Sequence, residues 1–253
     1  MANIALITAA GVGSRTHQFI PKQFISIKDK PIIIYTLEKF QQHPEIDKIV
    51  VVCLEGWDAC LKSYAKQFGI TKLEAVVFGG ATGYDSINNG LNAIGEFAKP
   101  DDIVLIHDGN RPATDADIIT DCIAKVKEKG VAITCISTTE VVYDVSSERP
   151  KMLNRENLLR TQTPHASTFG YIRSVYDEAK EKGITTTVAF CSLLTELGKD
   201  VYFVNGSEKN FKITVKDDID LFKGMLLVED SEKGLLWYTL KITKKKLKIL
   251  QKI

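Results

Sequence analysis

The stretch Ile4–Phe24, IALITAAGVGSRTHQFIPKQF, decides the fold that we predict for this chain. Its first residues, Ile4–Thr8, are apolar or β-branched and predict a short buried strand, which the small-residue turn Ala9–Gly13 follows. A strand that runs into a glycine turn exposes several backbone N–H groups at one point, and such a nest binds phosphate oxygens. Arg15 and Lys22 can add two cations, so the stretch predicts a site for a nucleoside triphosphate.

Length and composition indicate a soluble α/β protein. The chain has 253 residues, which favours one domain with an appendage over two full domains. Its 33 basic and 32 acidic side chains leave a net charge of +1, which gives no argument for a nucleic-acid partner. No apolar run approaches the ~20 residues of a membrane helix, and the start lacks a basic signal region. Because the five cysteines are scattered without metal-ligand spacing, we expect a reduced, cytoplasmic protein.

Strand-like and helix-like runs alternate along the first half of the chain. The apolar runs 48–54 and 102–106 predict strands that are covered on both faces. Helical spacing of apolar residues predicts helices between them, and this rhythm is typical of a mostly parallel sheet with helices on both faces. In such α/β folds of the Rossmann-like kind, ligands bind beyond the carboxyl ends of strands. The turns 9–15, 79–86 and 107–111 all follow predicted strands and are the candidate site.

The second half of the chain departs from this rhythm. Residues 138–162 are polar, with two β-rich pieces around a Ser-Ser-Glu-Arg-Pro turn, and predict a projecting β-arm. A lone two-stranded arm is marginal in water, so we expect it to pack on a second copy of the chain. A strand is expected at 211–213 and a helix at 217–227. We divide the chain into a domain at 1–228 and an extension of unknown role at 229–253.

The second and third turns supply further candidate residues. Gly80 and Ala81 allow close approach of a planar group, and Ser86 can donate to a base edge. Asp85 or Ser86 can equally cap the following helix, which we expect at 85–97. Asp108 can hold Mg²⁺ or orient a substrate hydroxyl, and Arg111 can bind a phosphate with two nitrogen atoms. The alternative for this pair is an ion pair that stabilises the turn.

Three more basic residues could serve a phosphorylated substrate. Arg155 and Arg160 lie in the predicted arm, and Lys212 lies in the run KNFKIT. Each alone is more often a surface charge. The histidines His17, His43 and His165 show no partner pattern, and we assign no role to them.

Taken together, these motifs resemble one family. The order A-A-G-x-G-x-R, P-K-Q, G-G…D-S-I, H-D-x-x-R-P and N-x-K-I-T is similar to the sugar-alcohol-phosphate cytidylyltransferases, over about residues 4–227. That family holds the 2-C-methyl-D-erythritol 4-phosphate enzymes and the D-ribitol 5-phosphate enzymes. The resemblance implies a nucleotide-diphospho-sugar transferase domain, a homodimer formed through the arm, CTP as co-substrate and Mg²⁺ as metal.

The resemblance also implies roles for the candidate residues. CTP binding falls to Ala9, Ala10, Gly11, Gly13, Arg15, Lys22, Gly80, Ala81, Ser86 and Asp108, with Arg15 and Lys22 stabilising the attacked phosphorus. Asp108, Arg111, Arg155 and Lys212 bind the acceptor, and Asp108 is the candidate metal ligand. The expected catalytic residues are Arg15, Lys22, Arg155 and Lys212. The implied reaction is in-line attack of the acceptor's phosphate oxygen on the α-phosphorus of CTP. Because that oxygen is already anionic, positioning and charge neutralisation suffice.

Two departures from the family pattern bear on the substrate. Gly83 stands where the family often has Arg, and the segment Thr185–Phe190 lacks the acidic cluster of the erythritol-phosphate enzymes. The chain therefore resembles the ribitol-phosphate and capsule-type members more, and we expect D-ribitol 5-phosphate as acceptor, for surface polysaccharide. The alternatives are 2-C-methyl-D-erythritol 4-phosphate, for isoprenoid synthesis, and a nucleotide-binding subunit with impaired catalysis. A dinucleotide-dependent dehydrogenase is disfavoured because the third glycine of that fingerprint is missing.

Overall fold

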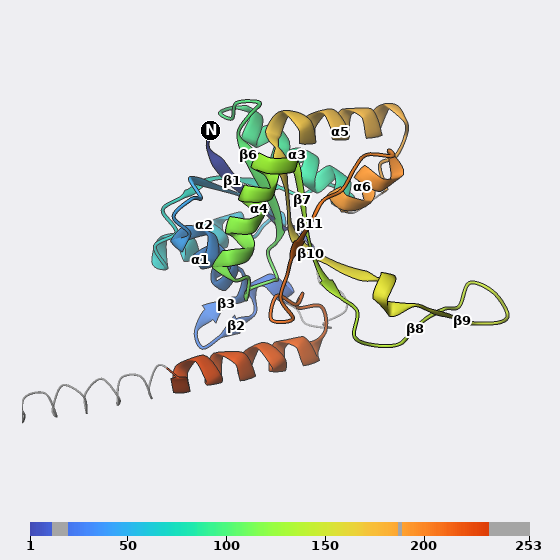
Figure 1. Ribbon diagram of the computed structural model, residues 1–253. Coiled ribbons are helices and arrows are strands. Elements are labelled where there is room, and N and C mark those ends of the chain that lie inside the picture. Colours follow the sequence, from blue (N-terminus) through green and yellow to red (C-terminus); the bar gives the residue numbers. More distant parts are fainter. Residues whose placement is uncertain (12–19, 187–188, 233–253) are drawn as a thin grey trace, which may run out of the picture. The chain divides into compact units, whose positions relative to one another are not determined.

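The computed structural model describes residues 1–11, 20–186 and 189–232 (Figure 1). These residues divide into two units, Met1–Lys212 and the segment that begins at Ile213, and each is described by itself. The predicted turn residues Gly13 and Arg15 lie outside the described residues.

A seven-stranded sheet forms the centre of the first unit, with the strand order β11-β7-β10-β6-β1-β4-β5. β10 pairs antiparallel with both of its neighbours, and the other pairs are parallel, so the predicted mostly parallel sheet is confirmed. The register sets Thr8 beside Asp108, so β1 and β6 end at the same edge of the sheet. The strands are β1 (Asn3–Ala9), β4 (Lys48–Cys53), β5 (Leu73–Phe78), β6 (Ile103–Asp108), β7 (Val131–Ser137), β10 (Leu159–Thr168) and β11 (Phe203–Asn205).

Helices cover both faces of this sheet, as predicted (Figure 1). On one face pack α1 (Ile32–Gln42), α2 (Asp58–Gln67) and α4 (Ala116–Lys129); on the other pack α3 (Gly83–Gly95), α5 (Phe169–Glu181) and α6 (Phe190–Glu196). Successive residues of β1 belong to opposite cores: Ala5 and Ile7 face the first group of helices, and Ile4 and Leu6 face the second. This is why the strand is apolar at every position rather than at alternate ones.

The predicted arm is shorter than expected. A hairpin of β8 (Val142–Asp144) and β9 (Lys151–Leu153) projects from the unit, and the short 3₁₀ turn η3 (Arg155–Asn157) follows it (Figure 1). Residues 159–162, which we had included in the arm, belong instead to β10 and pair with β7. The sequence LRTQTPHAST of β10 is polar and contains a proline, so it carries no apolar pattern that would predict a central strand.

Two other boundaries differ from expectation. α3 begins at Gly83 rather than at 85 because Thr82 caps it: its hydroxyl accepts the N–H of Asp85 at 3.1 Å, and the Asp85 carboxylate accepts the N–H of Thr82 at 3.1 Å. The strand expected at 211–213 does not form. Side chains hold this segment instead, as the next subsection describes. The remaining short elements are η2 (Lys22–Phe24), β2 (Ser26–Ile27) and β3 (Lys30–Pro31).

In the second unit, residues 216–232 are helical, which agrees with the helix expected at 217–227. Its start is stabilised by Asp218, whose carboxylate accepts the N–H groups of Thr214 at 2.6 Å and Val215 at 2.8 Å. The predicted extension 229–253 begins within this helix and then leaves the described residues. Among the described helices, none has the length and apolar character that crossing a membrane requires.

Candidate active site

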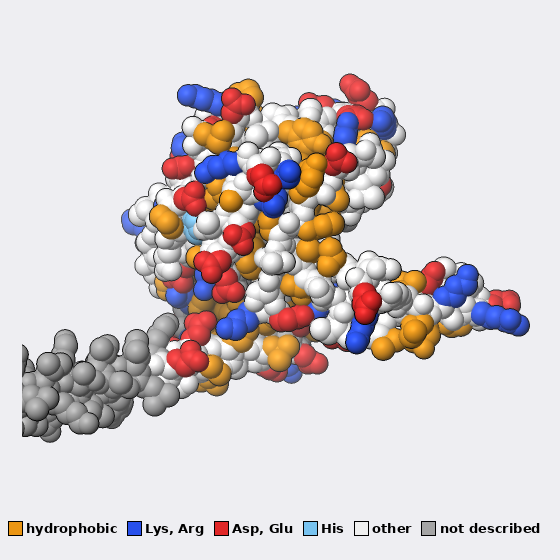
Figure 2. Space-filling model, in the orientation of Figure 1, with side chains coloured by type: hydrophobic (Ala, Val, Ile, Leu, Met, Phe, Trp, Pro, Cys, Tyr) orange, Lys and Arg blue, Asp and Glu red, His pale blue; other side chains and the backbone are white. Residues whose placement is uncertain are grey.

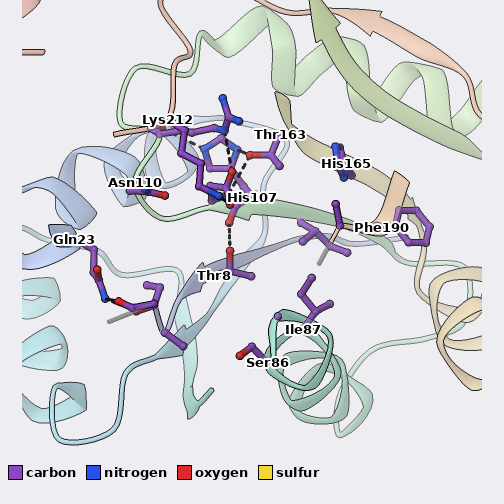
Figure 3. A pocket seen from close by; sticks show the side chains of 18 of the residues that line it. Thr8, Gln23, Ser86, Ile87, His107, Asn110, Thr163, His165, Phe190 and Lys212 are labelled. Carbon is purple, nitrogen blue, oxygen red and sulfur yellow. Dashed lines mark hydrogen bonds and ion pairs between the residues drawn. The ribbon is translucent and has the colours of Figure 1, made fainter. Parts of the chain in front are cut away.

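A pocket of about 590 Å³ opens where β1 and β6 end (Figure 3). Its walls come from the turn after β1, from η2, from the loop between β5 and α3, from the end of β6, from β10 and from Lys212. Three turns far apart in the sequence therefore meet, as the rule for α/β sheets predicts. The predicted site residues that line the pocket are Ala9, Ala10, Gly11, Lys22, Gly80, Ala81, Ser86, Asp108, Arg111 and Lys212.

Gln23 holds the turn after β1 in shape. This side chain is buried, and its amide nitrogen donates to the carbonyl oxygens of Ala9 at 2.7 Å and Gly11 at 3.1 Å. These two bonds fix the carbonyls at either end of Ala9–Gly11, and all three residues line the pocket. Gln23 belongs to the P-K-Q motif, which by itself predicts no role for it. The role follows from the two carbonyls that its amide contacts in the structure.

The first two turns touch each other at Gly79. A Cβ atom on Gly79 would overlap the Cβ of Ala10, so only glycine allows the loop after β5 to lie against the turn after β1. This contact joins the turn proposed for phosphate to the loop proposed for the base.

Ser86 shapes that loop. Its hydroxyl accepts the N–H of Gly80 at 3.1 Å and donates to the carbonyl of Thr82 at 2.9 Å. Because a hydroxyl has one proton, Ser86 as it stands offers a ligand a lone pair rather than a donor. The expectation that Asp85 or Ser86 caps the helix is wrong, because the cap is Thr82; Asp85 completes the capping box and Ser86 lies within the first turn of α3.

Asp108 is the centre of the charged side of the pocket. One carboxylate oxygen receives Lys212 Nζ at 2.8 Å, and the other receives Arg111 Nε at 2.9 Å. Burial by itself raises the pKa of this carboxyl, but the charges of Lys212 and Arg111 and the hydrogen bonds that they donate hold the pKa well below its usual range. With Lys22, the described lining residues carry three cations and one carboxylate, so this pocket favours an anion.

A buried polar cluster stands behind Asp108. The His107 ring lies between Thr163 Oγ1, 3.1 Å from Nδ1, and Thr114 Oγ1, 3.1 Å from Nε2. The backbone carbonyl of Asn210 accepts a hydrogen bond from Arg111 Nη1 at 2.7 Å. The Asn210 side-chain amide donates to the backbone carbonyl of Thr163 at 2.8 Å. Burial lowers the pKa of His107 to about 4, so the ring is neutral at pH 7.

His165 also lines the pocket, although sequence analysis assigned it no role. It is buried, its Nε2 has no hydrogen-bond partner among the described residues, and burial lowers its pKa to about 4. Thr163 and His165 were missed because β10 was not predicted. Asn210 lies in a bend after β11, and the signal available for it was its place in the motif N-x-K-I-T.

Arg155 is the predicted site residue that lies apart from this pocket. It belongs to η3 at the base of the arm, and its Nη1 donates to the carbonyl of Thr139 at 3.0 Å. Arg160, which was predicted in the arm, lies in β10 and pairs with Glu208. The arm itself bears apolar side chains that are more than half exposed, namely Val141, Tyr143, Val145 and Met152 (Figure 2).

Comparison with known proteins adds an independent line of argument. A family model described as IspD, 2-C-methyl-D-erythritol 4-phosphate cytidylyltransferase, matches residues 3–227. A Lacticaseibacillus paracasei protein named ribitol-5-phosphate cytidylyltransferase is 40% identical over 226 residues, which cover 88% of this chain and 97% of that protein. A Clostridium botulinum protein named 2-C-methyl-D-erythritol 4-phosphate cytidylyltransferase is 36% identical over 229 residues, with coverage of 88% and 97%.

Solved structures agree with these matches. The crystal structure of Francisella tularensis 2-C-methyl-D-erythritol 4-phosphate cytidylyltransferase is 29% identical and has a TM-score of 0.71. The likeness covers 87% of this chain and 98% of that one.

Proposed function

Because this chain belongs to the IspD family of cytidylyltransferases, we propose that it transfers CMP from CTP to D-ribitol 5-phosphate, giving a CDP-polyol and pyrophosphate. The observation that carries the proposal is the convergence of Lys22, Arg111 and Lys212 on one pocket, beside the backbone turn after β1. A triphosphate and a sugar-alcohol phosphate are both anions, and this pocket offers cations and backbone N–H groups to both.

The geometry supports a division of labour within the pocket. The turn Ala9–Gly11 and Lys22 would hold the phosphates of CTP, and the loop at Gly80 and Ala81 would hold the cytosine. The acceptor's phosphate oxygen then attacks the α-phosphorus, a P–O bond forms, and the bond to the β-phosphate oxygen breaks as pyrophosphate leaves. Lys22 neutralises charge that builds up on the phosphoryl oxygens. Arg15, which lies outside the described residues, is proposed to act with it.

The Asp108 carboxylate is better suited to hold Arg111 and Lys212 in place than to act as a general base. Since Arg111 and Lys212 occupy its two oxygens and depress its pKa, it stays ionised and would accept a proton poorly at pH 7. The attacking phosphate oxygen needs no base, so this state is compatible with the reaction.

We propose that Mg²⁺ reaches the site with CTP. Among the described lining residues Asp108 is the one carboxylate, and no group of three acidic, histidine or cysteine side chains gathers there to hold a metal. Mg²⁺ commonly binds through one or two carboxylates, waters and substrate phosphates, and this donor set fits that mode. Because Arg111 and Lys212 already pair with its two oxygens, Asp108 would hold the ion through water, and the ion would supply further charge neutralisation at the phosphates.

Two observations favour D-ribitol 5-phosphate as the acceptor. The Lacticaseibacillus paracasei relative that carries that substrate in its name is somewhat more similar than the Clostridium botulinum relative named for the erythritol compound. The wall at Ala189 and Phe190 is apolar. It belongs to the segment 185–190, which lacks the acidic cluster that the sequence resemblance leads us to expect in an erythritol-phosphate enzyme. The family model bears the erythritol name, so 2-C-methyl-D-erythritol 4-phosphate is the second candidate.

We also propose a homodimer in which the arm completes the site of the partner subunit. The arm exposes Tyr143 and Met152 side by side as a cross-strand pair, which is apolar surface that a second copy could cover. Arg155 does not line the pocket of its own chain, so its proposed contact with the acceptor requires delivery to another subunit.

A substrate panel tests the proposed reaction. The protein is incubated with CTP, Mg²⁺ and one of D-ribitol 5-phosphate, 2-C-methyl-D-erythritol 4-phosphate or glycerol 3-phosphate, and pyrophosphate release is measured. We expect the fastest release with D-ribitol 5-phosphate and none when CTP is replaced by ATP. Faster release with the erythritol compound would assign the second function. No release with any acceptor would favour the impaired nucleotide-binding subunit.

A further inference from the structure

The polar cluster behind Asp108 contains more than the proposed chemistry needs. His107, Thr114 and Asn210 are all fully buried, and Thr114 and Asn210 do not line the pocket. Burying polar side chains is unfavourable unless each finds its partners. The partners of this cluster include Thr163, which accepts the Asp108 N–H, and the carbonyl and guanidinium of Arg111.

The directions follow from the two ends of the chain of hydrogen bonds. The Arg111 carbonyl oxygen, 3.2 Å from His107 Nε2, can only accept, so in a neutral ring the proton sits on Nε2 and Nδ1 is an acceptor. The Thr163 hydroxyl accepts the Asp108 N–H at 3.1 Å and donates its own proton to Nδ1 at 3.1 Å. The Nε2–H also faces Thr114 Oγ1 at 3.1 Å. Figure 3 shows His107 and Thr163 meeting at the pocket wall.

The far end of the chain agrees with this assignment. Thr114 Oγ1 donates to Asn210 Oδ1 at 2.9 Å, so it is free to accept from His107. Asn210 Nδ2 donates to the Thr163 carbonyl at 2.8 Å and toward Gln162 Oε1 at 3.3 Å. Thr114 Oγ1 also lies 3.3 Å from the Arg111 carbonyl, a longer contact than the 2.9 Å to Asn210 Oδ1. With the ring proton on Nδ1 instead, His107 Nε2 and the Arg111 carbonyl would be two facing acceptors.

This network contacts Asp108 and Arg111 directly and lies close in sequence to Lys212. It holds the Asp108 backbone through Thr163 and the Arg111 backbone through His107. The backbone carbonyl of Asn210 accepts a hydrogen bond from the Arg111 guanidinium. Asn210 is also two residues from Lys212, in a described segment that pairs with no strand.

We propose that His107, Thr114 and Asn210 are positioning residues, which fix Arg111 and Lys212 on opposite oxygens of Asp108 through one buried proton arrangement. The proposal rests on the proposed function for its kinetic consequence, because misplaced Arg111 and Lys212 would bind the phosphates of the transition state poorly. An error of about 1 Å in such groups can cost about 100-fold in rate.

The first experiment tests the proton arrangement and needs no activity. In the full chain labelled with ¹⁵N and ¹³C histidine, we expect the Nε2–H tautomer for His107 at pH 7, with its signals assigned by their loss in His107→Gln. The chain has four histidines, so this assignment is practicable. An Nδ1–H tautomer or a charged ring would overturn the proposal, whatever reaction the protein catalyses.

The second experiment separates positioning from mere stability with a matched pair at Thr114. Thr114→Val keeps the shape and removes the hydroxyl, whereas Thr114→Ser keeps the hydroxyl. We expect Thr114→Val to lower kcat about 10-fold to 100-fold with CTP affinity changed by less than about 3-fold, and Thr114→Ser to restore most of the rate. A Thr114→Val protein that melts at lower temperature but keeps its kcat would overturn the proposal. If the wild-type protein releases no pyrophosphate, the proposed function fails, and the tautomer alone decides this inference.

Discussion

At the scale of single residues, the pocket is an arrangement of charge around Asp108. Its carboxylate is paired twice, so the local charge of Asp108, Arg111 and Lys212 is positive rather than neutral. Lys22 adds a further cation to the lining of the pocket. A carboxylate within a cationic site keeps the lysine and arginine side chains ordered before an anion arrives, which lowers the entropy cost of binding.

Lys22 is the residue whose loss should affect the reaction most directly. We expect Lys22→Ala to lower kcat by about 100-fold or more, because a cation near the attacked phosphorus stabilises the transition state more than the ground state. Steady-state pyrophosphate release measures this, and circular dichroism checks the fold. Lys62→Ala, at an exposed cation of α2 outside the pocket, is the matched control. Equal rates for the two variants would remove Lys22 from the mechanism.

The buried histidines predict how stability depends on pH. The folded-state pKa of His165 is lowered to about 4, whereas an unfolded histidine has a pKa near 6.5, so the unfolded chain binds more protons between these values. The free energy of unfolding should therefore fall as pH drops from about 6.5 to about 4, by about 1.4 kcal/mol for each pKa unit. Urea unfolding across this range should show a shallower slope for His165→Gln. A slope unchanged by that substitution would contradict the buried neutral state.

At the scale of elements, some strands of the sheet can be predicted from the sequence and one, β10, cannot. β1, β4 and β6 are apolar on both faces because helices cover both, and that pattern alone identifies them. β10 lies in the same sheet, but it supplies Thr161, Gln162 and Thr163 to the pocket and is therefore polar. The sequence predicts the phosphate turn and Asp108 because a strand followed by a turn is a local pattern. It misses Thr163 because β10 is defined by pairing with strands that are distant in the sequence.

Roles within the site divide in a similar way. Lys22, Asp108 and Lys212 are charged, and their charges in the sequence indicate an anion site. The structure brings all three into one pocket. The amide groups of Gln23 and Asn210 carry no charge, and their use is visible only when their carbonyl partners are known. Ser86 is a residue whose predicted role the structure changes. Its hydroxyl was expected to donate to a base edge, but it donates to the Thr82 carbonyl instead.

The β8–β9 arm is the element on which the proposed dimer depends. We expect the double variant Tyr143→Ser/Met152→Ser to shift the protein from dimer to monomer at micromolar concentration, because it removes an exposed apolar cross-strand pair. Sedimentation velocity measures the change. Phe78→Ser, at an exposed aromatic residue at the end of β5, is the control. A wild-type protein that sediments as a monomer would contradict the dimer outright.

At the scale of the whole molecule, Arg155 links the arm to the chemistry. If it serves the pocket of a partner subunit, a chain that lacks Arg155 and a chain that lacks Lys22 should complement each other. Mixing Arg155→Ala with Lys22→Ala after subunit exchange should restore about a quarter of the wild-type activity, since half of the dimers are mixed and each has one complete site. The unmixed variants are the controls. No gain on mixing would place Arg155 in its own chain's site or outside the reaction.

The central claim is that CTP occupies the pocket between the turn after β1 and the loop after β5. A crystal structure of the protein with CTP and Mg²⁺, in the absence of acceptor, tests this most directly. We predict the triphosphate against the backbone of Ala9–Gly11 and the Lys22 ammonium group, with the cytosine at Gly80 and Ala81. A nucleotide bound elsewhere, with this pocket empty at saturating CTP, would contradict the account.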